Sequence, residues 1–486
     1  MKEYAAKQPS PWVSVLPLAV LTLLLYVVIR CFGGDAINGG SQIALLSATS
    51  VCVMLAIGIY RCKWAVLEEA IIDNIRASAS AIIILLLIGA IAGSWMVSGV
   101  VPTMIYFGLK ILHPSFFLVA SCAICAGVSL MTGSSWTTIA TIGVALMGIG
   151  QAMGFPEGWI AGAIISGAYF GDKISLLSDT TVLASSTVGV PIFTHIRYML
   201  YTTVPSFVIA LAVFVIAGLT LDHTGGTHAG MYAESLRGTF RITPWLLAVP
   251  VATGVLIVRK LPAIVTLFCA AVFACIAMLL AQPELVAKVA GVGGLDFMSG
   301  FKGVLMSCFG PTAIPTGSPQ LDELVATRGM AGMLNTVWLI ICAMCFGGVM
   351  TGSGMLGALT SVFLRFVRRA FSAVASTVGA GIFFNLCTAD QYISIILSGR
   401  LFRELYAEQG LEPRLLSRSV EDSATVCSVL VPWNSCGMTQ ATVLGVSTFV
   451  YMPYCIFNIV SPLMSLMVAA IGWKIKRAAG TAAHPH

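Results

Sequence analysis

Long apolar runs that alternate with short polar segments dominate this chain. Residues 111–156 contain no Asp, Glu, Lys or Arg, and residues 423–473 contain none either. A membrane-spanning helix needs about 20 apolar residues, so each run is long enough for two spans or for a span and a re-entrant segment. The runs lack the alternation over about ten residues that a β-barrel strand requires. The pattern therefore predicts about eleven to thirteen helices that cross or half-cross a membrane.

Composition indicates the same class of protein. The chain is 58% hydrophobic and 9% charged, and its mean hydropathy is +0.95. Soluble domains carry about 25% charged residues, so we expect an all-α integral membrane protein with the lipid bilayer as its main partner. The net charge of +6 is small and indicates no nucleic-acid partner. Basic clusters at 365–369, 400–418 and 474–477 predict cytoplasmic loops, because such loops are enriched in Lys and Arg.

Polar interruptions recur in the two halves of the chain in the same order. The segment 93–99 recurs 255 residues later (348 − 93), and the segment 132–136 recurs 256 residues later (388 − 132). Asp172 finds a counterpart in Asp422, 250 residues later (422 − 172). Chance similarity among apolar segments is the alternative, but it explains the shared order poorly. Interrupted spans at matching positions of two halves are typical of transporters.

These features predict five parts of the chain. They are N-terminal spans with an interfacial amphipathic helix (1–80), a first transport repeat (81–220), a polar loop with connecting spans (221–330), a second transport repeat (331–475) and a basic cytoplasmic tail (476–486). The amphipathic helix is expected over 62–78, where acids and bases are mixed with apolar residues.

The segment 171–181 is charged although it lies between apolar runs. An acid at mid-bilayer costs about 2.5–3.5 kcal/mol, so embedded ionisable residues indicate an ion, proton or substrate site. Carboxylate and hydroxyl oxygens suit a hard cation such as sodium, and Lys173 is expected to neutralise Asp172 when no cation is bound. The alternative is a polar loop at the membrane surface. The candidate binding residues are Asp172, Lys173, Ser175, Ser178, Asp179, Thr180 and Thr181.

A hydroxyl-rich segment at 132–138 interrupts another apolar run beside a glycine. A helix that breaks here directs its amide ends at an anion or its carbonyls at a cation. Thr132, Ser134 and Ser135 are the candidates. The alternative is that these hydroxyls bond back to their own helix or pack between helices.

Embedded polar residues return in the second half. Asp390 has no basic residue within nine positions, so it must find a distant partner, bind a cation or hold a proton. The alternative is an acid at the mouth of a helix. A surface ion pair with Arg418 is the alternative for the acids at 421–422, and a plain helix kink is the alternative at Pro432. The candidates of this half are Asp390, Gln391, Tyr392, Glu421, Asp422, Ser423 and Asn434. The predicted sodium ligands of both halves are Asp172, Asp179, Asp390 and Asp422.

No catalytic arrangement accompanies the embedded acids. The six histidines lie away from the acids in sequence, in loops or the tail, and no spacing such as H-E-x-x-H occurs. We therefore expect neither an enzyme nor a cofactor. Two C-x-x-C pairs, at 122–125 and 342–345, lie in apolar sequence, which favours helix packing over metal or redox chemistry.

Together these motifs resemble the NhaC-type sodium/proton antiporter family of the ion-transporter superfamily. The matching segments are Thr132–Trp136, 167–173 (Gly-Ala-Tyr-Phe-Gly-Asp-Lys), Ser178–Thr181, Phe193–Arg197, Ala389–Tyr392, Glu421–Ser423 and Pro432–Asn434. The resemblance implies a polytopic helical bundle with two inverted structural repeats and broken or re-entrant helices. It also implies secondary transport across a bacterial inner membrane, with sodium ions and protons as transported or coupling ions.

The chain departs from the family pattern at three positions close to the first charged segment. Leu176 and Ser185 stand where the family usually has proline, and Val182 stands where it usually has asparagine. The loss of the asparagine removes a polar ligand candidate. It affects the expected cargo more than the expected fold.

Two functions remain open. The first is sodium/proton antiport, in which an acid sheds its proton before it binds sodium. The second is a sodium- or proton-coupled carrier of a small organic acid or an amino acid, because the family it resembles includes malate/lactate exchangers and amino-acid carriers. A channel is disfavoured, because selectivity rings need identical loops and the two halves differ here. A homodimer is compatible with either function.

Overall fold

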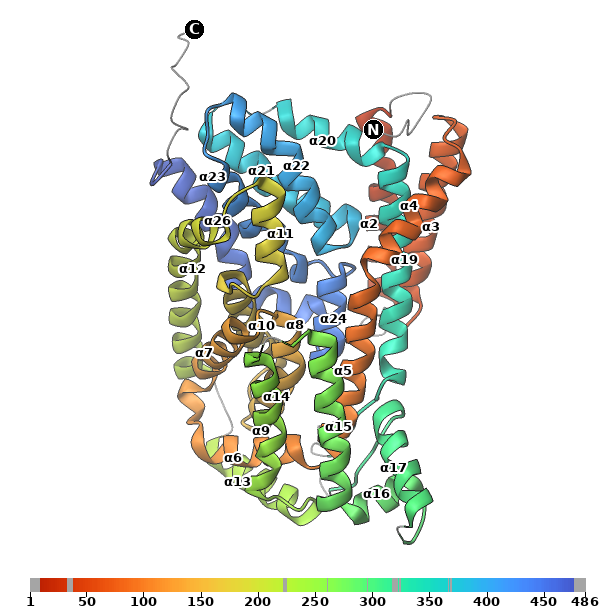
Figure 1. Cartoon of the computed structure of the whole chain (residues 1–486), viewed down its shortest axis with the longest axis vertical. Helices are drawn as coiled ribbons and strands as arrows, with labels where there is room; N and C mark the ends of the chain where they lie inside the picture. Colours follow the sequence, from red (N-terminus) through yellow and green to blue (C-terminus); the bar gives the residue numbers. More distant parts are fainter. Residues whose placement is uncertain are drawn as a thin grey trace.

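The molecule is a bundle of helices (Figure 1). The computed structural model describes residues 9–32, 38–221, 225–259, 261–294, 296–316, 322, 325–365, 367 and 369–475. Within these ranges every regular element is helical, apart from isolated bridge residues such as the antiparallel pair Thr312 and Thr327. The predicted basic tail, 476–486, lies outside the described residues. The all-α class is confirmed.

Eight helices of the described chain are long and apolar enough to cross a membrane. They are Pro11–Phe32 (α1 and α2), α3 (Gly40–Gly58), α5 (Ala79–Val97), α7 (Pro114–Thr132), α12 (Ile192–Thr220), α15 (Ala263–Ala281), Ala331–Gly352 (η4 and α19) and α21 (Ala370–Thr388). Three bent pairs raise the number to eleven if each is one span. The pairs are Glu157–Ile174 with Asp179–Val188 (α10 and α11), Gly230–Thr239 with Pro244–Val258 (α13, η3 and α14), and Thr448–Tyr454 with Ile456–Ile471 (α25, η7 and α26). The chain is a polytopic membrane protein.

Shorter helices complete the bundle. They are α4 (Trp64–Ala77), α6 (Val100–Ile111), α8 (Ser135–Thr138), η2 (Ile139–Gly143), α9 (Val144–Ala152), α16 (Pro283–Ala290), α17 (Phe297–Phe309), α20 (Met355–Arg365), α22 (Gln391–Glu408), α23 (Pro413–Val420), η5 (Glu421–Thr425), η6 (Ser428–Leu430) and α24 (Ser435–Leu444). Of these, η2 and η5 are π-helical, a conformation that is frequent at functional sites.

Helix α4 is the predicted amphipathic helix, and it packs along the second half of α19. A Cβ on Gly348 would lie 2.7 Å from the Cα of Ile71, so the two backbones are in close contact. Asn74 Nδ2 donates to the Met344 carbonyl at 3.4 Å, while the charged residues of α4 are exposed. The helix therefore belongs to the bundle, and its location at a membrane interface stays a prediction.

The two halves of the chain have the same local structure at a constant offset of 256 residues (389 − 133). In the first half α7 ends, Gly133 follows in the left-handed region (φ 66°), and Ser134 caps α8. In the second half α21 ends, Ala389 follows with φ 56°, and Asp390 caps α22. Each half therefore contains a helical hairpin with a left-handed residue at its tip.

A broken helix follows each hairpin at the same offset. Ser178 caps α11 and Asn434 caps α24 (434 − 178). Both short helices then end at a left-handed glycine, Gly189 with φ 81° and Gly445 with φ 70°. The repeat therefore includes the hairpin and the broken helix of each half.

Equivalent helices run in opposite directions. In Figure 1, α5 leads down to α6 at the lower end, whereas its counterpart α19 leads up to α20 at the upper end. Likewise α12, which comes after α11, runs downward, whereas its counterpart α26 runs upward towards the C-terminus. The predicted bundle with two inverted repeats and broken helices is confirmed. The assignment of 81–220 and 331–475 as units of transport stays a prediction.

The alignment of Asp172 with Asp422 at an offset of 250 was wrong. At the offset that the helix caps establish, Asp172 is equivalent to Ser428, and Asp422 is equivalent to Ser166. The two acids were paired by residue type, whereas the backbone geometry places them on different turns of the equivalent helices.

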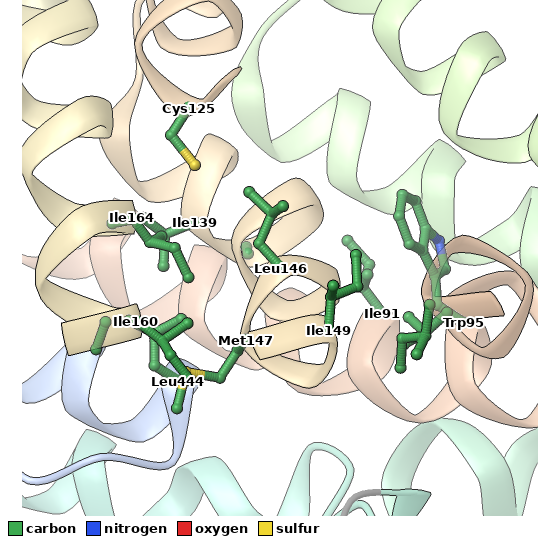
Figure 2. Packing of buried hydrophobic residues seen from close by; sticks show 14 of the residues in the cluster. Ile91, Trp95, Cys125, Ile139, Leu146, Met147, Ile149, Ile160, Ile164 and Leu444 are labelled. Atoms are coloured by element: carbon green, nitrogen blue, oxygen red, sulfur yellow. The ribbon is translucent and has the colours of Figure 1, made fainter. Parts of the chain in front are cut away.

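Glycines bring α10 onto the α7 arm of the first hairpin. A Cβ on Gly167 would lie 2.0 Å from the carbonyl oxygen of Cys122, and one on Gly171 would lie 2.2 Å from that of Ala126. This close approach places the end of α10 beside the hairpin tip. Figure 2 shows the apolar cluster that continues this packing, with Ile91 and Trp95 of α5, Leu146, Met147 and Ile149 of α9, Ile160 and Ile164 of α10, and Leu444 of α24.

We expect Gly167→Ala to lower the stability of the protein by about 1–3 kcal/mol, because the added methyl group has no space between α10 and α7. The measurement is thermal unfolding of the purified protein in detergent. Gly127→Ala is the matched control, since a Cβ at that position of α7 meets nothing within 4 Å. Equal melting temperatures for the two variants would contradict the packing argument.

Candidate functional site

Asp172 lies where the tip of the first hairpin meets the break between α10 and α11. The N–H and O–H of Ser135 both donate to Asp172 Oδ2, at 3.1 and 2.7 Å. Oδ1 has no hydrogen-bond partner among the described residues, and the side chain is buried. A Cβ on Gly133 would lie 2.5 Å from the carbonyl carbon of Leu177, so the hairpin tip touches the break. One carboxylate oxygen therefore remains available to a ligand.

Hydroxyls of the first charged segment stabilise the break itself. Ser175 O–H donates to the Leu130 carbonyl at 2.8 Å, and Thr181 O–H donates to the Lys173 carbonyl at 3.0 Å. These bonds satisfy carbonyls that a broken helix leaves without an intrahelical partner. Each hydroxyl oxygen keeps lone pairs for a further donor or a cation.

The start of α11 meets the other half of the molecule. Ser178 caps α11, and its Oγ lies 2.9 Å from Thr180 Oγ1. Tyr392 O–H, from the second hairpin, donates to Asp179 Oδ2 at 2.7 Å. Asp179 is exposed, whereas Asp172 is buried, and the two carboxylates are close enough to interact electrostatically. Asp179 therefore lies at the accessible side of Asp172.

Asp390 lies at the hairpin-to-break contact of the second half. Its Oδ1 accepts from the Ile393 N–H at 3.0 Å, and its Oδ2 accepts from Ser435 O–H at 3.3 Å. At the 256-residue offset, Asp390 corresponds to Ser134, and Ser435 corresponds to Asp179. The two halves therefore carry an acid on opposite sides of the same hairpin-to-break contact.

Amide side chains fasten the second break to the second hairpin. Asn434 Oδ1 accepts from the Cys436 N–H at 3.0 Å, and Asn434 Nδ2 donates to Asn385 Oδ1 at 3.2 Å. Gln391 Oε1 accepts from the Cys436 thiol at 2.7 Å. Asn434 is thus a helix cap in the structure, and its role as a neutral ligand stays a prediction.

Three predicted site residues bond to nearby backbone. Thr132 Oγ1 accepts from the Ser134 N–H at 3.1 Å, and Ser134 Oγ accepts from the Thr137 N–H at 3.2 Å. Ser423 O–H donates to the Ser419 carbonyl at 2.7 Å. For Thr132 and Ser134 the structure shows the local bonding that was the alternative, and Ser423 bonds locally as well.

Lys173 and Asp422 form a fully buried ion pair. Lys173 Nζ donates to Asp422 Oδ1 and also to Ser461 Oγ at 2.9 Å, and Thr202 O–H donates to Asp422 Oδ1 at 3.2 Å. The prediction that Lys173 neutralises Asp172 was wrong. Successive side chains of a helix point about 100° apart, so neighbouring residues of α10 face different partners. Lys173 occupies the coordination space of Asp422, and we leave Asp422 out of the proposed ligand set.

Two further charged groups are buried beside this pair. Arg418 lies over the ring of Tyr198 at 4.7 Å, and its Nε is 3.9 Å from Asp422 Oδ2. Since its side chain is fully buried, the alternative of a surface ion pair was wrong. Glu421 is also fully buried, and neither of its carboxyl oxygens has a hydrogen-bond partner among the described residues. It lies within electrostatic reach of Asp172.

The described interior holds more acids than bases. The buried acids are Asp172, Asp390, Glu421 and Asp422, and the buried bases of the same regions, apart from His195, are Lys173 and Arg418. An unpaired charge away from water is strongly unfavourable, so the excess carboxylates require protons or bound cations. No group of three or more His, Cys, Asp or Glu in the described part of the chain has the arrangement of a metal site. A cation here would therefore also need hydroxyl or carbonyl oxygens.

Sequence reasoning missed several polar partners. His195 was expected in a loop but is buried on α12, with Nδ1 2.8 Å from Ser417 Oγ. Thr202 and Ser461 contact the buried ion pair, and Ser435 contacts Asp390. Isolated hydroxyls in apolar helices carry no local signal that separates a partner of a buried charge from a packing residue.

A polytopic bundle with inverted repeats, broken helices and embedded ionisable groups defines a secondary transporter. The model of the Na+/H+ antiporter family matches residues 167–473, which is more than half of the chain. The chain belongs to this family, and the resemblance inferred from its motifs is confirmed.

Relatives with three different names are about equally similar to this chain. The Na(+)/H(+) antiporter NhaC of Alkalihalophilus pseudofirmus is 35% identical over 87% of this chain and 89% of its own length. The malate-2H(+)/Na(+)-lactate antiporter of Bacillus subtilis is 34% identical over 89% of each chain. The arginine/ornithine antiporter ArcD of Halobacterium salinarum is 34% identical over 96% of this chain and 93% of its own.

Among solved structures, the YdaH transporter of Alcanivorax borkumensis matches 84% of this chain and 89% of its own, with 12% identity. The TM-score is 0.38. Similarity at this level supports no argument about the site.

We expect Lys173→Met to destabilise the protein by about 3–5 kcal/mol, because it leaves Asp422 charged and unpaired in the interior. Thermal unfolding measures the loss, and the double variant Lys173→Met/Asp422→Leu should recover much of it. Arg76→Met is the control, since the Arg76–Asp73 pair is 75% and 60% exposed and contributes only about 0–1 kcal/mol. A single variant as stable as the control would contradict the role of the pair.

Proposed function

We propose that this protein is a sodium/proton antiporter of the bacterial inner membrane. The observation that carries the proposal is Asp172, a buried carboxylate in a helix break. It receives two hydrogen bonds from Ser135 and keeps one oxygen without a partner. None of the described bases forms an ion pair with it, and the adjacent Lys173 is paired with Asp422. A small cation or a proton is the simplest group that completes such a site.

The proposed ligand set for the cation centres on the first break. Asp172 supplies charge, and Ser135, Ser178 and the carbonyls of the unwound residues between α10 and α11 supply neutral oxygens. Asp179, held by Tyr392, is exposed at the accessible side and attracts cations towards Asp172. Asp390 is the candidate for a second charge-carrying position, because it is a buried acid at the hairpin-to-break contact of the second half.

Exchange follows from competition for the same carboxylate. Asp172 cannot hold a proton and ligate sodium at once, so sodium binding from one side requires proton release. Each state of the site then carries the same charge, which keeps the low-dielectric interior close to neutral. The inverted repeats supply the two-sided access, since they permit one bundle to rock against the other around a fixed site.

Basic residues indicate which end of the bundle faces the cytoplasm. Arg61 and Lys63 precede α4, Arg369 precedes α21, and Lys474 follows α26. These basic positions all lie at the starts or ends of helices on the side where the described chain ends, which the positive-inside rule places in the cytoplasm.

An exchanger of small organic acids or amino acids is the second candidate. Relatives named for malate/lactate and arginine/ornithine exchange are as similar to this chain as the NhaC antiporter is. The exposed apolar side chains of Leu176 and Val182 flank the exposed Asp179. An organic substrate would make apolar contacts with such side chains, whereas a sodium ion or a proton would not.

We expect Asp172→Asn to abolish sodium-driven pH change in proteoliposomes, because the neutral amide can neither exchange a proton nor balance a cation. The internal pH is followed with a trapped dye after a sodium gradient is imposed in simple salt buffer. Asp73→Asn is the control, since Asp73 is exposed on α4 and should leave the flux unchanged. Normal flux in well-expressed Asp172→Asn would overturn the assignment.

The same vesicles separate the two candidate functions. A pH change in sodium salt alone supports the antiporter, with no further solute needed. If the wild-type protein is silent until malate, lactate, arginine or ornithine is added, the antiporter proposal fails and the solute that restores flux identifies the cargo.

A further inference from the structure

Two cysteine thiols from different helices lie next to each other at one end of the bundle. Cys275 belongs to α15 and Cys308 to α17, and their sulfur atoms are 3.5 Å apart. Both side chains are half-buried. The two C-x-x-C pairs differ from this pair, because each of them lies within a single helix, α7 or α19.

Helices α15 and α17, which carry the two thiols, both pack against α5. Trp95 Nε1 of α5 donates to the Ala270 carbonyl of α15 at 3.2 Å. A Cβ on Gly93 of α5 would lie 1.9 Å from the carbonyl oxygen of Ser307 of α17, so the end of α17 is in close contact with α5. The next residue is Cys308. Backbone contacts therefore determine the positions of both cysteines.

The direction of α5 indicates on which side of the membrane the thiols lie. Helix α5 follows the segment 61–76, which holds Arg61, Lys63 and Arg76 beside three acids. The positive-inside rule counts the Lys and Arg residues and places the start of this segment in the cytoplasm. At the other end of α5, a Cβ on Gly99 would lie 2.5 Å from Nε2 of Gln282, just after α15 ends. Cys275 is six residues before the last residue of α15, about 9 Å along the helix. The pair therefore lies nearer the non-cytoplasmic end of the span, on the side of the membrane where disulfides persist.

We propose that Cys275 and Cys308 form a disulfide in the mature protein. The sulfurs are 3.5 Å apart and need to approach to the bonded distance of about 2.0 Å. The two thiols lose two protons and two electrons as the S–S bond forms. A disulfide of a thiol-oxidising protein accepts the electrons and protons by thiol–disulfide exchange and becomes a dithiol.

The disulfide fastens the connecting segment to the scaffold. It closes the chain from Cys275 to Cys308, which includes α16 and α17, against the span α15. Because α15 and α17 both contact α5, the cross-link holds these three helices as one unit. This inference does not depend on the proposed cargo.

Differential thiol labelling of the full-length protein tests the cross-link. Cells that produce the protein in their inner membrane are quenched with acid and denatured in light N-ethylmaleimide, then reduced and labelled with the deuterated reagent. Peptide mass spectrometry should find the deuterated label on Cys275 and Cys308 and the light label on Cys342. Light label on both Cys275 and Cys308 would overturn the proposal.

Variants test whether the bond clamps the helices. Cys275→Ser and Cys308→Ser should lower the melting temperature by the same amount, and the double variant should lower it no further, because either change removes one bond. In Cys308→Ser, the remaining Cys275 should carry light label. Additive losses in the double variant would contradict the clamp, and Cys345→Ser is the control that should leave the label on Cys275 unchanged.

Discussion

Helices that stop inside a membrane must satisfy the backbone groups at their ends, since no water is available there. At the helix starts, four capping side chains meet this constraint in the structure, namely Ser134 and Ser178 in the first half and Asp390 and Asn434 in the second. The caps hold the hairpin tips and the broken helices in register. The polar groups that make the breaks possible are therefore the same groups that surround the candidate ion site.

The two repeats share the same backbone geometry at the breaks but differ in the charged residues placed there. Caps, left-handed residues and helix ends recur at one offset, yet an acid stands at Asp390 in one half and at Asp172 and Asp179 in the other. Geometry is thus shared, whereas the electrostatic environment differs between the halves. Under the proposed function, we expect this asymmetry to give the two positions different affinities for protons and cations.

Neighbouring residues of α10 perform separate tasks because a helix directs them to different faces. Asp172 points to the hairpin tip and Ser135, while Lys173 points to Asp422 and Ser461. The ion pair links Lys173 of α10 to Asp422 of η5, and hydrogen bonds extend it to Ser461 of α26 and Thr202 of α12. It therefore holds these four elements together next to the candidate site. A charged segment that reads as one cluster along the chain is two clusters in space.

Much of this architecture is a local property of the sequence. Apolar runs of span length, the glycine and hydroxyl residues at the breaks and the embedded acids are each recognisable from a few adjacent residues, and their motifs identified the family correctly. The pairing of Lys173, the contact of Tyr392 with Asp179 and the burial of His195 were not recognisable. These depend on how helices more than 200 residues apart approach each other. The chain by itself determined where helices begin, break and carry charge, because capping and hydrophobicity act over a few residues. Only the tertiary structure decided which charges meet, because in a low-dielectric interior a charge is paired by whatever the packing of distant helices places beside it.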